Sequence, residues 1–144
     1  MLRTAFIDHI GIAVPDLAAA KQYYDQLMPI LGLRQWFKTS PDGPFNYGPD
    51  GGHGTQVFFY QAVEAGPYSP HRTGLHHIAF AVATRAIVRE AYQWALAQNA
   101  VIIDEPQEFP EYGQHYATYW FDPHGFKLEA VCFSHEGVSK TPSS

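Results

Sequence analysis

Two histidines and one glutamate lie in short runs that otherwise have the composition of buried strands. His9 falls in FIDHIGIAV, His77 in GLHHIAFAV and Glu129 in FKLEAVCF. A carboxylate in an apolar run is costly to bury unless it is paired or binds a metal. Two imidazoles and one carboxylate form a donor set that leaves open positions on a Zn²⁺ or Fe²⁺ ion. These three residues predict a divalent metal site, with Fe, Mn, Ni and Zn all open as the ion.

Each histidine also has a simpler interpretation. A single histidine in an apolar strand is more often a core residue than a ligand, so the hypothesis depends on the three residues converging. His76 is the main alternative because it adjoins His77, although strand alternation directs it to the helix side or the sheet edge. The remaining histidines in loops and at the tail follow no pattern that favours a site: His53, His71, His124 and His135.

An internal repeat explains how residues so far apart in the sequence can meet. FIDHIGIAVPDLAAAKQYYDQLMPILGL aligns with GLHHIAFAVATRAIVREAYQWALAQNAVI. In each copy a strand with a histidine precedes an N-cap, Asp16 or Thr84, and then a helix with apolar residues at helical spacing. Pro29 and Gly32 mark the end of the first helix, and Asn99 the end of the second. The buried stripes are expected at Leu17, Ala20, Tyr24, Leu27 and Leu31, and at Val88, Ala91, Tyr92 and Ala95.

Strand-like runs separated by turn signals follow each helix. They are LRQWFK, part of PDGPFNYGPDGGHG and TQVFFYQA in the first copy, and VIIDEP, HYATYWF and FKLEAVCF in the second. We predict an α+β fold in which two βαβββ modules form a cupped mixed β-sheet with a central cavity, with the helices packed outside. The modules are predicted at residues 1–65 and 76–135, with an intermodule linker at 66–75 and a flexible tail at 136–144.

Strand alternation predicts which side chains face the cavity. Each histidine shares a face with two small residues, Gly11 and Ala13 or Ala79 and Ala81, which leaves room for a ligand. The last strand of each module presents a second set: Gln56, Phe58 and Tyr60 in the first, and Lys127, Glu129 and Val131 in the second. Aligning HGTQVF with HGFKLE matches Phe58 to Glu129.

The composition limits the partners. The 144 residues are 46% hydrophobic and 16% charged, with a net charge of −5 and nine Lys and Arg, which argues against nucleic-acid and anionic-membrane surfaces. A small-molecule substrate is expected instead. The single cysteine, Cys132, excludes an internal disulfide and favours a buried thiol in a reducing compartment. With no signal peptide or membrane span predicted, we expect a cytoplasmic protein.

The paired modules, the strands DHIGIAV and HHIAFAV, and the turn YWFDPHGFKLEAV resemble the vicinal oxygen chelate superfamily over residues 5 to about 133. This superfamily includes glyoxalase I, bleomycin resistance proteins, fosfomycin-modifying enzymes and extradiol dioxygenases. The resemblance implies a divalent metal, held at the positions of His9, His77 and Glu129, that a substrate chelates through two neighbouring oxygens. Tyr119 matches a tyrosine near the bound oxygen in some members, although it can also be an ordinary strand aromatic. A homodimer is expected, with a cavity that lies in one chain or is shared between two.

Three departures from these relatives limit the choice of reaction. Phe58 takes the place of the fourth ligand of glyoxalase I, which argues against that isomerase chemistry in its usual form. Gly11 stands where the fosfomycin enzymes tend to carry threonine, and no basic segment is available to hold a phosphonate. Gln61 and Ala62 occupy the region of the catalytic histidine of the extradiol enzymes, so His53, His71 or His115 would have to replace it. The sequence therefore predicts the superfamily better than the reaction.

Two classes of function remain. In the first, a dioxygenase-like or lyase-like enzyme uses the metal as a Lewis acid on a catecholic or enolisable substrate, and Tyr119 and His115 move protons. His115 and Phe121 share a strand face with Tyr119, and the substrate-binding residues are predicted as Gln56, Phe58, Tyr60 and Phe121. In the second, a metal-free protein of the drug-sequestering, bleomycin resistance type holds an aromatic ligand in the same cavity. A structural subunit with a vestigial cavity would leave Glu129 unexplained.

Overall fold

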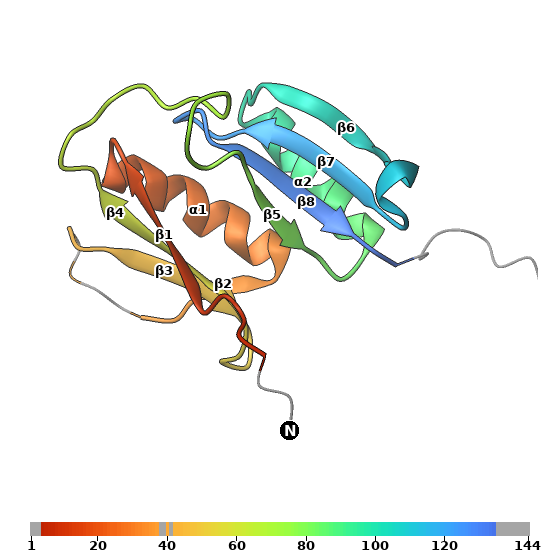
Figure 1. The fold of residues 1–144 in the computed structure, drawn as a ribbon, viewed down its shortest axis with the longest axis horizontal. Coiled ribbons are helices and arrows are strands. Elements are labelled where there is room, and N and C mark those ends of the chain that lie inside the picture. The colour runs from red at the N-terminus through yellow and green to blue at the C-terminus, as the bar shows by residue number, and fades with distance from the viewer. Residues whose placement is uncertain (1–3, 38–39, 41, 135–144) are drawn as a thin grey trace, which may run out of the picture. The chain divides into compact units, whose positions relative to one another are not determined.

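The computed structural model describes residues 4–37, 40 and 42–134, and the chain divides into two units. The first unit is Met1–Pro67 and the second is Tyr68–Ser144. Each contains a strand, a helix and three further strands in that order (Figure 1). This order confirms the α+β class and the two predicted βαβββ modules.

The first unit has one helix packed on a four-stranded mixed sheet. Its elements are β1 (His9–Val14), α1 (Leu17–Leu31), β2 (Leu33–Gln35), β3 (Phe45–Pro49) and β4 (Gln56–Gln61). The strand order is β1-β4-β3-β2, in which β1 runs parallel to β4 and the other neighbours are antiparallel. A helix between β1 and the later strands is what allows the parallel pair to form.

The second unit repeats this plan. Its elements are β5 (Ile78–Ala81), α2 (Arg85–Ala97), β6 (Ile102–Glu108), the short 3-10 helix η1 (Pro110–Tyr112), β7 (Tyr116–Phe121) and β8 (Lys127–Cys132). The strand order is β5-β8-β7-β6, again with one parallel pair, β5 and β8. Pro106 is tolerated in β6 because this strand lies at the sheet edge, where a missing N–H breaks no ladder.

The helices begin where the sequence predicts. Asp16 Oδ1 accepts a hydrogen bond from the backbone N–H of Ala19 at 3.0 Å, and Thr84 Oγ1 accepts one from Ile87 at 3.2 Å. Gly32 ends α1 at φ 85°, a left-handed conformation that favours glycine. Pro29 does not end α1 as predicted but lies inside its last turn, where its missing N–H removes a single backbone hydrogen bond.

The buried stripes agree with the prediction except at Tyr92, which is half-buried. Its hydroxyl lies 3.3 Å from Glu105 Oε1, so the ring packs along α2 while the polar end reaches the edge strand β6. Cys132 is buried and free, as expected.

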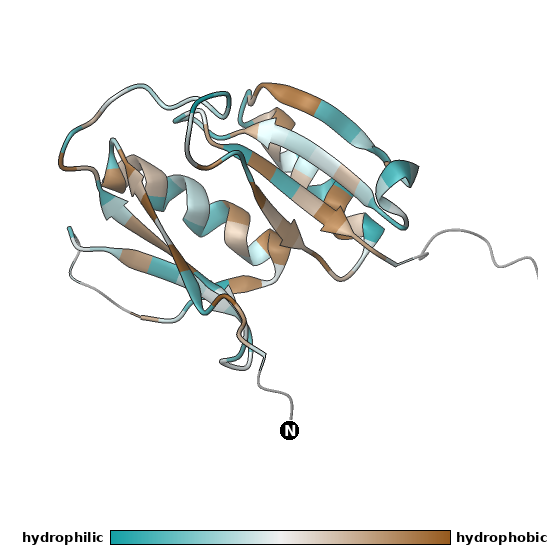
Figure 2. Cartoon of the chain, in the orientation of Figure 1, coloured by the Kyte–Doolittle hydropathy of each residue, from teal (hydrophilic) through white to brown (hydrophobic). Residues whose placement is uncertain are grey.

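Burial alternates along the first strand of each unit. Ile12 and Val14 are buried and His9 is exposed, and in the second unit Ile78 and Phe80 are buried while Ala79 is exposed. Figure 2 shows hydrophilic and hydrophobic bands along β1 and also along β8, the last strand of the second unit. The large apolar side chains therefore pack beneath the helix, and the histidines belong to the opposite face of each sheet.

The strand registers confirm how the two modules correspond. Gly11 pairs with Phe58 in the first unit, and Ala79 pairs with Glu129 in the second. His9 and His77 each precede the paired small residue by two positions. Phe58 is therefore the counterpart of Glu129, as the alignment of the two halves predicted.

Neither helix among the described residues is long and apolar enough to cross a membrane. The linker boundaries and a cavity shared by the modules stay predictions, and the predicted tail at 136–144 lies outside the described residues.

Candidate functional site

Glu129 is a buried carboxylate in the middle of β8, with only 2% of its surface exposed. Its Oε1 lies 2.7 Å from His115 Nε2, and its Oε2 lies 3.1 Å from His77 Nε2. An unpaired charge at this depth would be strongly destabilising, so the two imidazoles are what makes the position acceptable. The second unit thus brings together three of the predicted site residues: Glu129 and the two histidines that contact it.

His77 is held from both sides of its ring. Its Nδ1 lies 2.8 Å from His76 Nδ1, while its Nε2 faces Glu129. Two imidazole nitrogens at this distance share one hydrogen, so the contact with His76 orients the His77 ring. His76, which the sequence left as an alternative ligand, is an exposed neighbour of the ring and has no hydrogen bond to Glu129 among the described contacts.

Tyr119 lies on the same face of β7 as Ala117 and next to His115. Its hydroxyl is 3.5 Å from His115 Nε2, and the residue is 8% exposed. Burial, followed by the hydrogen bond and the charge of Glu129, raises the pKa of Tyr119 well above its usual value. The side chain is therefore held as a neutral phenol, whose hydroxyl can donate a hydrogen bond.

Aromatic rings surround this group more closely than the sequence predicted. The His115 ring lies 5.9 Å from Phe109, 5.3 Å from Tyr112 and 5.5 Å from Phe133 between centroids. Phe109 also packs on Tyr119. Phe109 and Tyr112 come from the β6–β7 connection, where no strand period applies, so sequence alternation gave no signal for them.

His9 occupies the corresponding place in the first unit. Its Nδ1 lies 2.7 Å from Asp8 Oδ2, and its ring packs edge-on against Phe58 with 5.3 Å between centroids. A carboxylate on one ring nitrogen orients the imidazole and makes the other nitrogen a better ligand, as in many metal sites. The Nε2 of His9 is therefore the atom available for coordination.

The predicted substrate-binding residues of the first unit share a face. Phe58 lies between Phe37 and Tyr60, with ring centroids 6.4 Å and 6.2 Å away. Gln56 stands beside His9 in the strand register, and its Oε1 accepts a hydrogen bond from Asn46 at 2.9 Å. The fourth predicted residue, Phe121, is half-buried in β7 of the second unit, opposite Lys127.

A cavity of about 530 Å³ in the first unit lies on the helix side of the sheet, away from the face of Gln56. Its walls include Lys21, Asp25 and Phe45. Phe45 pairs with Phe59, whose ring lies 4.3 Å from that of Tyr24 on α1, which places Phe45 beneath the helix. No pattern in the sequence pointed to this cavity.

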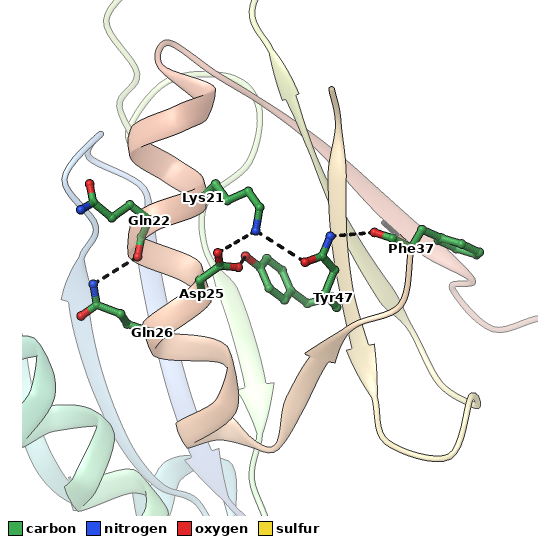
Figure 3. Close-up of polar contacts among 7 residues, drawn as sticks. Lys21, Gln22, Asp25, Gln26, Phe37 and Tyr47 are labelled. Atoms are coloured by element: carbon green, nitrogen blue, oxygen red, sulfur yellow. Dashed lines mark hydrogen bonds and ion pairs between the residues drawn. The ribbon is translucent and has the colours of Figure 1, made fainter. Parts of the chain in front are cut away.

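A polar network borders this cavity (Figure 3). Asp25 accepts hydrogen bonds from Tyr47 Oη and Lys21 Nζ, both at 2.6 Å. Burial, and then the hydrogen bond and charge of Asp25, raises the pKa of Tyr47 above its ordinary range. Lys21 Nζ also lies 3.5 Å from Gln35 Oε1, which links α1 to the end of β2.

Two donor atoms of the second unit, His77 Nε2 and Glu129 Oε2, have a spacing that fits a divalent ion. Two ligands about 2.1 Å from one ion and at right angles to each other lie about 3.0 Å apart, close to the 3.1 Å between His77 Nε2 and Glu129 Oε2. Within the described part of the chain, no group of three or more His, Cys, Asp or Glu side chains forms a metal site. His9 belongs to the other unit, so the complete three-residue set stays a prediction.

The sequence model of the Glyoxalase/Bleomycin resistance protein/Dioxygenase superfamily matches residues 6–130. The chain belongs to this superfamily. The match spans both βαβββ units and includes every predicted metal ligand, which agrees with the resemblance seen in the sequence.

Solved structures of the superfamily have the same fold. A proposed glyoxalase from Bacillus halodurans is 29% identical with a TM-score of 0.72, covering 88% of this chain and 94% of that one. A glyoxalase/dioxygenase from Nostoc punctiforme is 21% identical with a TM-score of 0.67, covering 92% and 98%. A lactoylglutathione lyase from Agrobacterium tumefaciens is 19% identical with a TM-score of 0.60, covering 90% and 94%. No curated protein matches the chain.

Proposed function

We propose that this superfamily member is a divalent-metal-dependent enzyme that acts on a small, oxygen-rich substrate of catecholic or enolisable type. The buried carboxylate of Glu129, which faces His77 at 3.1 Å, is the observation that carries the proposal. A buried carboxylate beside an imidazole, on a face opposite the helix, is difficult to explain as packing alone.

The residues that would hold the ion are His77 and Glu129, with His9 as the third ligand. Fe, Mn, Ni and Zn all accept such a nitrogen and oxygen set. When bound, the ion would supply Lewis-acid chemistry by polarising the oxygens of the substrate. The orientation of the ligands comes from the chain itself, through His76 on the His77 ring and Asp8 on the His9 ring.

Two residues of the second unit are suited to proton transfer. Tyr119 remains a phenol at neutral pH, and its Oη lies 3.5 Å from His115 Nε2. The phenol can donate a proton to a developing oxyanion, and the adjacent imidazole can return one to it. Phe109 packs against both rings and limits the access of water to them.

The first unit supplies the recognition of the substrate. Phe58 and Tyr60 stack at 6.2 Å with an interplanar angle of 20°, and they offer an aromatic wall. Gln56 supplies a polar group beside that wall, and Phe121 is the proposed contact from the second unit. A planar, aromatic or enolic substrate fits these groups best.

A second candidate is a metal-free small-molecule-binding protein of the drug-sequestering type. The hydrogen bonds from His77 and His115 satisfy both oxygens of Glu129 without an ion, which favours this alternative. The aromatic face of the first unit would then bind the ligand by itself. In either case we propose a cytoplasmic homodimer with a small-molecule ligand.

The test is turnover after metal loading. Chelator-treated protein is reloaded separately with Fe²⁺ under anaerobic conditions, Mn²⁺, Ni²⁺ and Zn²⁺, and is assayed against catechols and enolisable carbonyl compounds. Metal-dependent turnover that Glu129→Ala abolishes and His53→Ala retains supports the enzyme. Tight binding of an aromatic ligand that is the same with and without metal, and with no turnover, supports the alternative.

A further inference from the structure

Gln56 lies on the aromatic face of the first unit, next to the candidate ligand His9. The register pairs His9 with Gln56, and alternation along β4 places Gln56 on the side of Phe58 and Tyr60. The residue is half-exposed, so its amide can meet a ligand. Which end of the amide faces outward decides which ligand it can recognise.

Asn46 fixes that end. It pairs with Phe58 across β3 and β4, which puts it on the same face, and it is fully buried. Asn46 Oδ1 accepts a hydrogen bond from the backbone N–H of Phe37 at 3.1 Å, and Asn46 Nδ2 donates to Gln56 Oε1 at 2.9 Å. Both polar atoms of the buried amide are therefore used.

The orientation follows from the donor and acceptor roles. The backbone N–H of Phe37 can only donate, so it must meet the oxygen of Asn46 and not the nitrogen. The Nδ2 of Asn46 then faces Gln56 and can bond only to an oxygen, which uses the Oε1 of Gln56. The N–H₂ group of Gln56 is left, and no hydrogen bond joins it to another described residue.

The backbone of Phe37, whose N–H donates to Asn46, is itself held in place. The carbonyl of Phe37 accepts a hydrogen bond from Gln35 Nε2 at 2.7 Å, and Gln35 Oε1 lies 3.5 Å from Lys21 Nζ. Figure 3 shows Lys21 on α1 joined by dashed lines to Asp25 and to the Gln35 amide, which in turn meets the backbone of Phe37. The backbone of Phe37 is therefore held at its N–H by Asn46 and at its carbonyl by Gln35, so Asn46 accepts from a donor that is fixed in place.

We propose that Asn46 is a positioning residue that turns the N–H₂ group of Gln56 outward, so that this face binds an acceptor oxygen on an aromatic ligand. The acceptor is a carbonyl or a similar oxygen, and its ring packs against Phe58 and Tyr60. The inference rests on the proposed function, which places the substrate on this face. It adds that the substrate group facing Gln56 is a hydrogen-bond acceptor.

The test uses metal-free protein in the presence of a chelator, so that it does not depend on the metal site. Two neutral aromatic probes of similar size are titrated into ¹⁵N-labelled protein: acetophenone, whose carbonyl accepts, and aniline, whose amine mainly donates. The side-chain amide signals of Gln56 are followed by NMR. We expect acetophenone to shift these signals and to bind roughly three- to tenfold more tightly than aniline.

Two variants should reverse this preference. In Asn46→Asp the introduced carboxylate accepts from both Phe37 and Gln56, so the Gln56 amide turns and its oxygen faces the ligand. In Gln56→Glu, which changes a half-exposed position and should fold, Asn46 still donates to one oxygen and the other can only accept. Both variants should then bind aniline more tightly than acetophenone, whereas Gln56→Met should lose the preference.

An unchanged preference in Gln56→Glu, or acetophenone shifts at Lys21 and Phe45 with none at Gln56, would overturn the inference. If the Gln56 contact is found as predicted but no ion binds the protein, the proposed enzyme fails and the inference stands. If the ion binds and the contact is absent, only the inference fails.

Discussion

The closest contact of Glu129 with an imidazole is with His115, a residue outside the proposed ligand set. The distance from Glu129 Oε1 to His115 Nε2 is 2.7 Å, compared with 3.1 Å from Glu129 Oε2 to His77 Nε2. One oxygen of the carboxylate is thus fixed by the residue just before β7, and the other is directed at His77. His115 therefore acts on the site first by orienting Glu129.

This relationship predicts the effect of His115→Ala. The variant should bind a divalent ion about 10- to 100-fold more weakly, because the ligand loses the contact that orients it. The stoichiometry at saturating metal should not change. Competition with a chromophoric chelator measures the affinity, His53→Ala serves as the exposed control, and His115→Gln should restore part of the affinity because its amide can still donate to Glu129. Equal affinities in parent and His115→Ala would contradict this role.

Tyr119→Phe separates proton transfer from metal binding. The variant keeps the ring that packs on Phe109 and loses only the hydroxyl, so the metal content at saturating metal should match that of the parent. Turnover should fall by about 10²- to 10⁴-fold, which is the usual contribution of a positioned acid or base. The measurement is kcat on the metal-loaded enzyme. A loss of metal together with activity would show instead that the hydroxyl supports the ligands.

The buried contact of Tyr47 with Asp25 should make the free energy of unfolding depend on pH. Its hydroxyl donates to Asp25 at 2.6 Å, and its raised pKa means that folding favours the neutral phenol. The unfolded chain releases this proton near pH 10, so the stabilisation is complete below that pH and is lost as the pH rises above it. Tyr47→Phe should be less stable by about 1–3 kcal/mol at pH 8 and should lose less stability than the parent between pH 8 and 11.

Denaturant unfolding at the two pH values measures this difference, with the exposed Tyr112 changed to Phe as the control. Parallel losses of stability in the parent and Tyr47→Phe would mean that the contact with Asp25 does not control the titration.

Gly48 lies so close to Trp36 that a larger residue at this position should destabilise the fold. A Cβ at this position would overlap the indole of Trp36, whose Nε1 donates to Pro49 O at 2.9 Å. Gly48→Ala should destabilise the protein by about 1–3 kcal/mol because the ring must move. Gly66→Ala, where nothing lies within 4 Å of the added atom, should have little effect. Unfolding followed by tryptophan fluorescence compares the two variants, and equal stabilities would show that the ring moves freely.

Much of the fold follows from local patterns in the sequence. Asp16 and Thr84 predict the helix starts because a short polar side chain can accept the first free N–H groups. The match between Phe58 and Glu129 follows from the internal repeat, and the strand registers confirm it. These features depend on neighbours in sequence or on a repeated period, which a single sequence contains.

The features that the sequence did not predict depend on contacts between residues far apart in the chain. Asn46 looks like a turn residue in FNYGPDGG, and only the pairing of β3 with β4 shows that it lies beside Gln56. The contact between Tyr47 and Asp25 joins a strand to a helix across 22 positions. Alternation placed His115 on the face of Tyr119, but it could not show that His115 approaches Glu129 more closely than His77 does.

The most direct test of the central claim is the metal content of protein purified without a histidine tag and reloaded with Fe, Mn, Ni or Zn. The account predicts close to one ion per chain in the parent and in His53→Ala, and little or none in His9→Ala, His77→Ala and Glu129→Ala. No ion above background in the reloaded parent, or an ion that Glu129→Ala retains at full stoichiometry, would contradict it.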